Sequence, residues 1–158
     1  MEHVVFNVIK EKKGDTLVVR LIGSIEENVV FEKEIGVPPQ NMDLYCKEIS
    51  RINSVGVKSW IKYFQSCQSK GTKLRFFECS PPIVEQLNLI SNFSGNGLVE
   101  SIFVPFNCRN CQAELLGLFR CEDIKKMKFK IPLLKCNKCG GDAEFDDIPE
   151  EYFEFLSR

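Results

Sequence analysis

The chain has 158 residues, of which 44% are hydrophobic and 27% are charged, with a formal net charge of -1. This length allows one main core with a small additional module, and the near-zero net charge excludes a global attraction to nucleic acid or to anionic membranes. No apolar run reaches the ~18–20 residues of a membrane-spanning helix, and the first residues lack the pattern of a secretory signal, so we expect a cytoplasmic protein with no membrane partner.

Two apolar, β-branched runs open the chain, at about residues 3–9 and 16–22. The "EKKGD" between them suits a turn, so they predict an antiparallel hairpin. The next segment, "ENVVFEKEIGVPPQN", has a weak strand signal and two prolines, which favours an irregular connection. "MDLYCKEI" then alternates apolar and polar residues and predicts a strand with one buried face.

From residue 54 the period of the apolar residues becomes helical. A helix over residues 54–70 is predicted by the spacing of Val57, Trp60, Ile61, Phe64 and Cys67. "TKLRFFEC" predicts a strand, "SPPIVEQLNLISNF" a second helix capped by Ser80, and "LVESIFVPF" a further strand. Strands that alternate with helices pair in parallel through right-handed crossovers, so we expect an α/β domain over residues 1–106.

Four of the eight cysteines form two C-x-x-C pairs: Cys108, Cys111, Cys136 and Cys139. This spacing is typical of a zinc site in which four thiolates converge at ~2.3 Å on one Zn²⁺. An iron site with four thiolates and a pair of redox motifs are the alternatives, although neither pair precedes the amphipathic helix that a redox motif requires. Four protein ligands leave no position for water, so the ion is expected to support folding in a zinc ribbon over residues 107–147.

The other four cysteines are not predicted to be ligands. Cys46, Cys67 and Cys79 lie on apolar faces or at the ends of predicted elements and are expected to be small buried hydrophobic residues. Cys121 lies between the two pairs, but four better-spaced ligands already complete a tetrahedral site.

Between the cysteine pairs, "ELLGLFR" and "KKMKFKIPLLK" are predicted to form an antiparallel ribbon in which Lys126, Lys128 and Lys130 share one face. These lysines are candidate contacts to nucleic acid, which gives an alternative function as a zinc-ribbon nucleic-acid-binding protein. The other interpretation is a solvated strand whose lysines prevent edge pairing. "IPEEYFEFLSR" predicts a C-terminal helix over residues 148–158 that packs on the main sheet.

The order of hairpin, strand, "INSVG" turn, helix, strand ending in "SPP", helix and strand resembles the STAS family of anti-sigma-factor antagonists. The similar stretches are "LVVRLIGSI", "INSVGVKSW", "SKGTKLRFF" and "CSPPIVEQLNLI", within residues 1–106. The resemblance implies a STAS-like mixed sheet with helices, a regulatory role without enzymatic activity, and a protein partner such as an anti-sigma-factor-like kinase or another signalling protein. It implies a partner surface at the turn and the start of the helix: Asn53, Ser54, Val55, Gly56 and Lys58.

In that family, the hydroxyl residue just before the glycine of this turn is phosphorylated, and the added charge changes partner affinity. Val55 stands at that position and has no hydroxyl, while Asn53 replaces the usual aspartate. The expected switch is therefore lost or moved to Ser54, whose side chain is equally explained as the helix cap. No catalytic motif accompanies His3, the sole histidine, so an enzyme is not expected.

Overall fold

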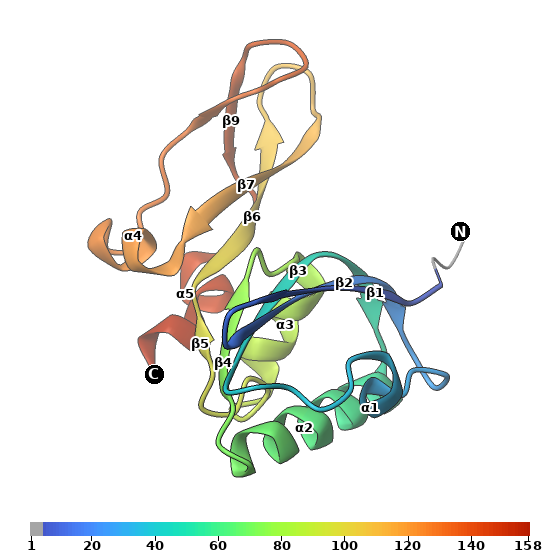
Figure 1. Ribbon diagram of the computed structural model, residues 1–158. Helices are drawn as coiled ribbons and strands as arrows, with labels where there is room; N and C mark the ends of the chain where they lie inside the picture. Colours follow the sequence, from blue (N-terminus) through green and yellow to red (C-terminus); the bar gives the residue numbers. More distant parts are fainter. Residues whose placement is uncertain (1–4) are drawn as a thin grey trace.

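The larger of two sheets has five strands in the order β1-β2-β3-β4-β5, seen in the computed structural model, which describes residues 5–158. Its strands are β1 (Asn7–Lys13), β2 (Thr16–Ile25), β3 (Asn41–Ile52), β4 (Lys73–Phe77) and β5 (Leu98–Val99). β1 pairs with β2 in antiparallel fashion and all other neighbours are parallel (Figure 1). The predicted hairpin and parallel order are confirmed for the described residues, while His3 lies outside them.

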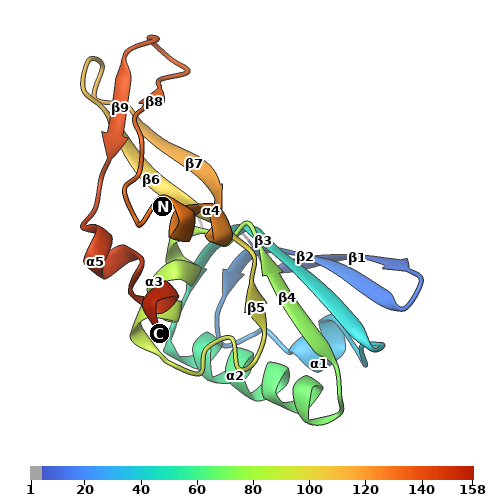
Figure 2. The same cartoon turned by 90° about the vertical axis from the view of Figure 1, so that its left-hand side faces the viewer.

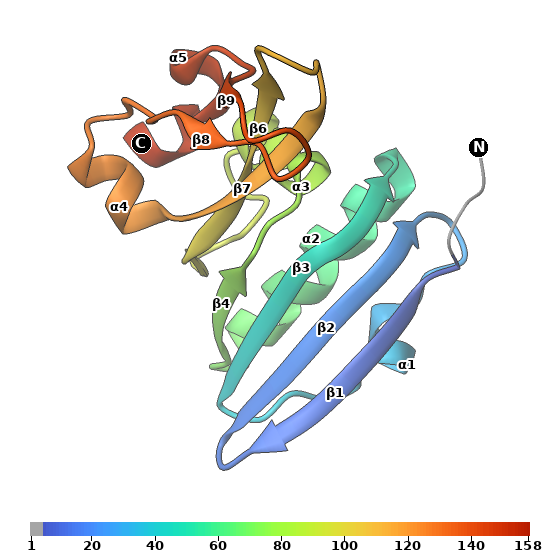
Figure 3. The ribbon, with the colours of Figure 1, turned by 90° about the horizontal axis from the view of Figure 1, so that it is seen from above.

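Helices pack against one face of this sheet: α1 (Phe31–Glu34), α2 (Ser54–Ser69) and α3 (Pro81–Leu89). Among residues 5–158, no helix lies over the opposite face of β1, β2 and β3 (Figure 3). Trp60 anchors the core between sheet and helices, because its ring stacks on Phe93 at 4.9 Å and its indole N–H donates to the Phe93 carbonyl at 3.0 Å. α1 replaces the irregular connection predicted there, and its buried residue, Phe31, packs against Trp60.

The strand predicted over "LVESIFVPF" is divided at Glu100. β5 ends the first sheet at Val99, whereas β6 (Ser101–Cys108) belongs to a second sheet. The Glu100 N–H donates to the Phe76 carbonyl at 2.8 Å, and the Glu100 carbonyl accepts from the Cys121 N–H at 2.9 Å. One residue therefore bonds to both parts of the chain and lets the strand change sheets.

The second sheet is antiparallel, with the order β7-β6-β9-β8, and projects from the first as an arm (Figure 2). Its remaining strands are β7 (Glu114–Arg120), β8 (Leu134–Lys135) and β9 (Asp142–Phe145). The predicted ribbon is wrong, because β7 pairs with β6 rather than with "KKMKFKIPLLK". That segment leaves helix α4 (Cys121–Lys126) and turns through Lys128 and Phe129, whose φ angles are 54° and 64°.

The C-terminal segment consists of two short pieces, α5 (Pro149–Tyr152) and the 3-10 helix η1 (Glu154–Ser157), rather than one helix. It packs on the predicted domain of residues 1–106, but on α3 and on Phe103 of β6 rather than on the main sheet. The side chain of Asn88 donates to the Tyr152 carbonyl and accepts from the Phe155 N–H, each at 3.0 Å. The Tyr152 hydroxyl donates to the Phe103 carbonyl at 2.6 Å, and burial raises the pKa of this hydroxyl.

The chain therefore has an α/β fold with mixed and antiparallel sheets. Among the described residues, no helix is long and apolar enough to span a bilayer.

Candidate metal centre and interaction turn

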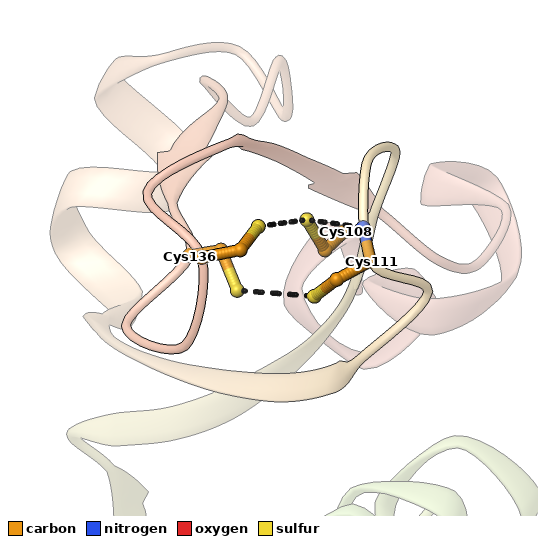
Figure 4. Close-up of side chains that lie close together, drawn as sticks. Cys108, Cys111 and Cys136 are labelled. Atoms are coloured by element: carbon orange, nitrogen blue, oxygen red, sulfur yellow. Dashed lines mark hydrogen bonds between the residues drawn. The ribbon is translucent and has the colours of Figure 1, made fainter.

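Both C-x-x-C pairs lie at the end of the projecting arm. Cys108 is the last residue of β6, and it pairs with Ala143 of β9, which brings the turn after β6 against the turn between β8 and β9. The four sulfur atoms all lie within 4.8 Å of one another. In Figure 4 the side chains of Cys108, Cys111 and Cys136 point toward a common centre. The structure thus brings the four predicted cysteines together.

The two cysteine turns have the same backbone bonding. In the first, the Cys108 N–H donates to Ala113 at 2.9 Å and the Cys108 carbonyl accepts from Gln112 at 3.1 Å. In the second, the Cys136 N–H donates to Gly141 at 2.8 Å and the Cys136 carbonyl accepts from Gly140 at 2.9 Å. Each is a tight turn that directs both of its sulfurs to one side.

The residue after the second cysteine is left-handed in both turns. Gly140 has φ 76°, as a glycine readily does, but Gln112 has φ 64° in the equivalent place. A non-glycine residue adopts this conformation at some cost. Gln112 has no sequence signal for it, and only the matching position of Gly140 in the other C-x-x-C pair could have indicated it.

Backbone and side-chain N–H groups surround the sulfurs. Cys108 accepts from the backbone N–H groups of Asn110 and Cys111, each at 3.4 Å. Cys139 accepts from the Asn110 side-chain amide at 3.4 Å and the Gly141 N–H at 3.3 Å. Hydrogen bonds of this kind stabilise a thiolate, which is the form that binds a metal ion.

In the metal-free protein, the thiols of the cluster have different pKa values. The Asn110 amide, followed by the Gly141 N–H, lowers the pKa of Cys139 to about 6. The Ala113 N–H lowers the pKa of Cys111. The neighbouring thiols, above all Cys139, and desolvation have the opposite and larger effect, so this pKa is raised to about 11. Binding of a cation would therefore release protons from this cluster.

The geometry fits a tetrahedral thiolate site. With metal–sulfur bonds of ~2.3 Å, the sulfurs of a regular tetrahedron stand ~3.8 Å apart. The distance from Cys108 Sγ to Cys139 Sγ is 3.5 Å, and that from Cys111 Sγ to Cys136 Sγ is 3.7 Å. Cys108 and Cys136 are buried while Cys111 and Cys139 are exposed, so the site lies at the surface of the arm. These four cysteines could hold a metal ion.

The remaining cysteines do not join this cluster. Cys46, Cys67 and Cys79 are buried in the core, as predicted, and Cys121 is buried at the start of α4. Burial is the main cause that raises the pKa of Cys121 to about 12, which keeps this thiol protonated near neutral pH.

The turn predicted as a partner surface connects β3 to α2. The side-chain oxygen of Asn53 accepts from the Gly56 N–H at 2.8 Å, so Asn53 is the cap of α2, and the prediction that Ser54 caps it is wrong. The Asn53 amide also donates to the Glu27 carboxylate at 2.7 Å. Gly56 is buried against the backbone of Ile25.

Three residues of this turn face solvent. Ser54 and Lys58 are exposed, and the side chain of Val55 is 42% exposed although it is apolar. The structure therefore presents one apolar, one hydroxyl and one cationic side chain together on the first turn of α2.

The three lysines considered as nucleic-acid contacts do not form a row on a strand. Lys126 ends α4 and pairs with Glu122 at 3.1 Å. Lys128 and Lys130 lie in the turn that follows and border a cavity of about 410 Å³ that Glu150 and Glu154 also line. Nearby carboxylates offset the positive charge that phosphate binding would need.

The sequence matches no model of a known protein family and none of the characterised proteins with which it was compared.

Proposed function

We propose that this chain is a non-enzymatic interaction module of the STAS type, which binds a signalling protein through the first turn of α2. The observation that carries the proposal is the position of that turn. Asn53 caps α2 directly after β3, and the exposed Ser54, Val55 and Lys58 stand together beside it. An exposed apolar side chain can bury its surface against a partner, and a neighbouring lysine can add charge complementarity at the edge of that contact.

The chemistry of the turn favours a surface without the phosphorylation switch of the resembled family. Val55 has no hydroxyl. The Glu27 carboxylate accepts a hydrogen bond from Asn53 at the N-terminus of α2, where the helix dipole already favours its negative charge. A phosphate added to this turn would be repelled by that carboxylate. An anti-sigma-factor-like kinase remains the proposed class of partner, bound through contact rather than through phosphate transfer.

The cysteine cluster supports one structural Zn²⁺ per chain in this proposal. Zinc prefers a tetrahedron of four thiolates, and such a site has no open position for water or substrate. The ion would join the turn after β6 to the turn before β9 and so hold the end of the arm. Elemental analysis of protein purified without added metal should return about one zinc per chain. Iron in its place, or four freely alkylatable thiols, would contradict this part.

The partner surface is tested by crosslinking and mass spectrometry in a lysate of the source cells. Val55→Arg and Lys58→Glu change exposed side chains and leave the cap intact, so both should fold and both should lose the partner. Lys73→Glu is the matched control, because it makes the same charge change at the start of β4. Retention of the same partner by all three variants would overturn the proposed surface. Phosphate found on Ser54 in the same spectra would show that a switch has moved there.

A further inference from the structure

A groove runs along the outer side of α3, away from both the cysteine cluster and the turn before α2. Its volume is about 550 Å³, within the range of ligand-binding pockets. It is formed by α3, β6 and the C-terminal segment, with the lining Pro81, Pro82, Glu85, Asn88, Leu89, Pro105, Asp147, Glu151 and Tyr152.

The apolar part of the lining, which we call the floor, consists of the three prolines and Leu89. Three of the lining residues are prolines, which have no N–H to offer, and the side chain of Leu89 is 69% exposed. The polar groups that could interrupt this floor are already bonded. The Tyr152 hydroxyl donates to Phe103, and the side chain of Asn88 bonds to Tyr152 and Phe155.

The rim of the groove is acidic. Glu85, Asp147 and Glu151 are exposed, and no lysine or arginine is among the lining residues. Within residues 5–158, none of these three carboxylates forms an ion pair. Elsewhere the exposed carboxylates of Glu48 and Glu144 each have an arginine partner. Arg158 donates to the Leu87 and Asn88 carbonyls, but its ion pair is with Glu154. The groove thus has three carboxylates without an ion pair beside an apolar floor.

These carboxylates do not form a cation site. Among the described residues, the cysteine cluster is the only group of acidic, cysteine or histidine side chains close enough to share one ion. A ligand that meets all three acids must be extended and must carry more than one positive charge. It must also bring apolar groups to cover Leu89 and the prolines.

We propose that this groove binds a basic peptide segment of a partner protein, with arginine or lysine side chains on the rim carboxylates and apolar side chains on the proline and leucine floor. Complementary charge on the rim steers such a segment and fixes its register, while burial of the floor supplies affinity. A nucleic acid or an acidic peptide would be repelled by the same carboxylates. The proposal is independent of the turn before α2, since it uses different residues.

The test uses the full, metal-loaded chain and two fluorescein-labelled peptides that differ only in charge, RLRPLRLR and ELEPLELE. Fluorescence anisotropy should show binding of the arginine peptide alone, weakening as salt rises from about 50 mM to about 500 mM. The double variant Glu85→Gln, Glu151→Gln should weaken that binding by about two- to thirtyfold, because two rim contacts are lost. Leu89→Ser should weaken binding without changing its salt dependence.

The control variant Glu32→Gln, Glu114→Gln removes the same charge from exposed positions outside the groove and should bind as the wild type does. Val55→Arg should also leave this binding unchanged. The proposal is overturned if the arginine peptide does not bind at the low salt concentration, if both peptides bind alike, or if the groove and control double variants lose affinity equally.

Discussion

The side-chain oxygen of Asn53 accepts a hydrogen bond from the backbone N–H of Gly56 at 2.8 Å, and this bond begins α2. Replacing Asn53 with alanine removes the cap, so the free energy of unfolding should fall by about 1 kcal/mol. Asn53→Ser should keep most of the stability, because serine can accept the same N–H. Ser54→Ala should have little effect, and a larger loss for Ser54→Ala than for Asn53→Ala in urea unfolding would contradict this assignment.

Gly56 lies against the backbone of β2. A Cβ atom at this position would come within 2.9 Å of the Ile25 carbonyl carbon and still closer to its oxygen. Since backbone cannot move aside as a side chain can, Gly56→Ala should lower the free energy of unfolding by about 1–3 kcal/mol. Lys58→Ala, on the exposed side of the same helix, is the control and should be nearly neutral. Equal denaturation midpoints for the two variants would rule out this contact.

Thiol reactivity should separate the two sets of cysteines. With the metal removed, Cys139 is exposed and its pKa is about 6, so it is largely thiolate at neutral pH and should be alkylated first by iodoacetamide. Cys121 is buried with a pKa of about 12 and should react only after unfolding. Peptide mass spectrometry over time gives this order, and early modification of Cys121 would contradict the fold of the arm.

Metal affinity should depend on pH in one direction. The ion binds thiolates, so protons compete with it, and affinity must fall as the pH falls. Because Cys111 has a pKa of about 11 in the metal-free protein, it gives up a proton on binding at neutral pH. Affinity should therefore drop by at least about tenfold for each pH unit of acidification. Chelator competition at several pH values measures this slope, which Cys121→Ser should leave unchanged. A flat profile would exclude thiolate ligation.

The attachment of the C-terminal segment depends strongly on Asn88. Its side chain makes two hydrogen bonds to that segment, to Tyr152 and Phe155. Asn88→Ala should cost about 1–3 kcal/mol of stability, since each bond contributes about 0.5–1.5 kcal/mol. Hydrogen exchange should increase at the Phe155 amide. Asn92→Ala, at an exposed position after α3, should leave both measurements unchanged, and equal exchange in the two variants would contradict the role of Asn88.

Much of the main sheet could be predicted from periodicity. The alternation around Leu44 and the helical spacing around Trp60 each extend over enough residues to distinguish a strand from a helix. α1 has four residues, which is about one turn, and so short a helix has no recognisable period. The predicted cap, Ser54, is one residue from the observed cap, Asn53, because asparagine and serine are both good caps and are adjacent in the sequence.

The wrong prediction of a ribbon in the arm has a different cause. Met127, Phe129 and Ile131 alternate with lysines as a strand would, yet they pack against the core from a turn in which Phe129 has a left-handed φ of 64°. An alternating pattern of apolar residues shows only that every second side chain is buried. A turn can bury every second residue just as a strand does. The cysteine site was predictable because its ligands are defined by spacing alone. The acidic groove was not, since its rim residues are up to 66 positions apart in the chain.

The length of β6 determines the distance between the base of the arm and the cysteine cluster at its tip. Its eight residues run from Ser101, just after the end of the first sheet, to Cys108 in the cysteine cluster. Seven steps of ~3.3 Å along a strand give β6 a length of about 23 Å. The acidic groove meets β6 at Pro105, three steps or about 10 Å from Cys108. An ion at the tip and a ligand in the groove could therefore cooperate through one partner that engages both. Such a partner would gain avidity from the second contact, at an effective concentration set by this separation.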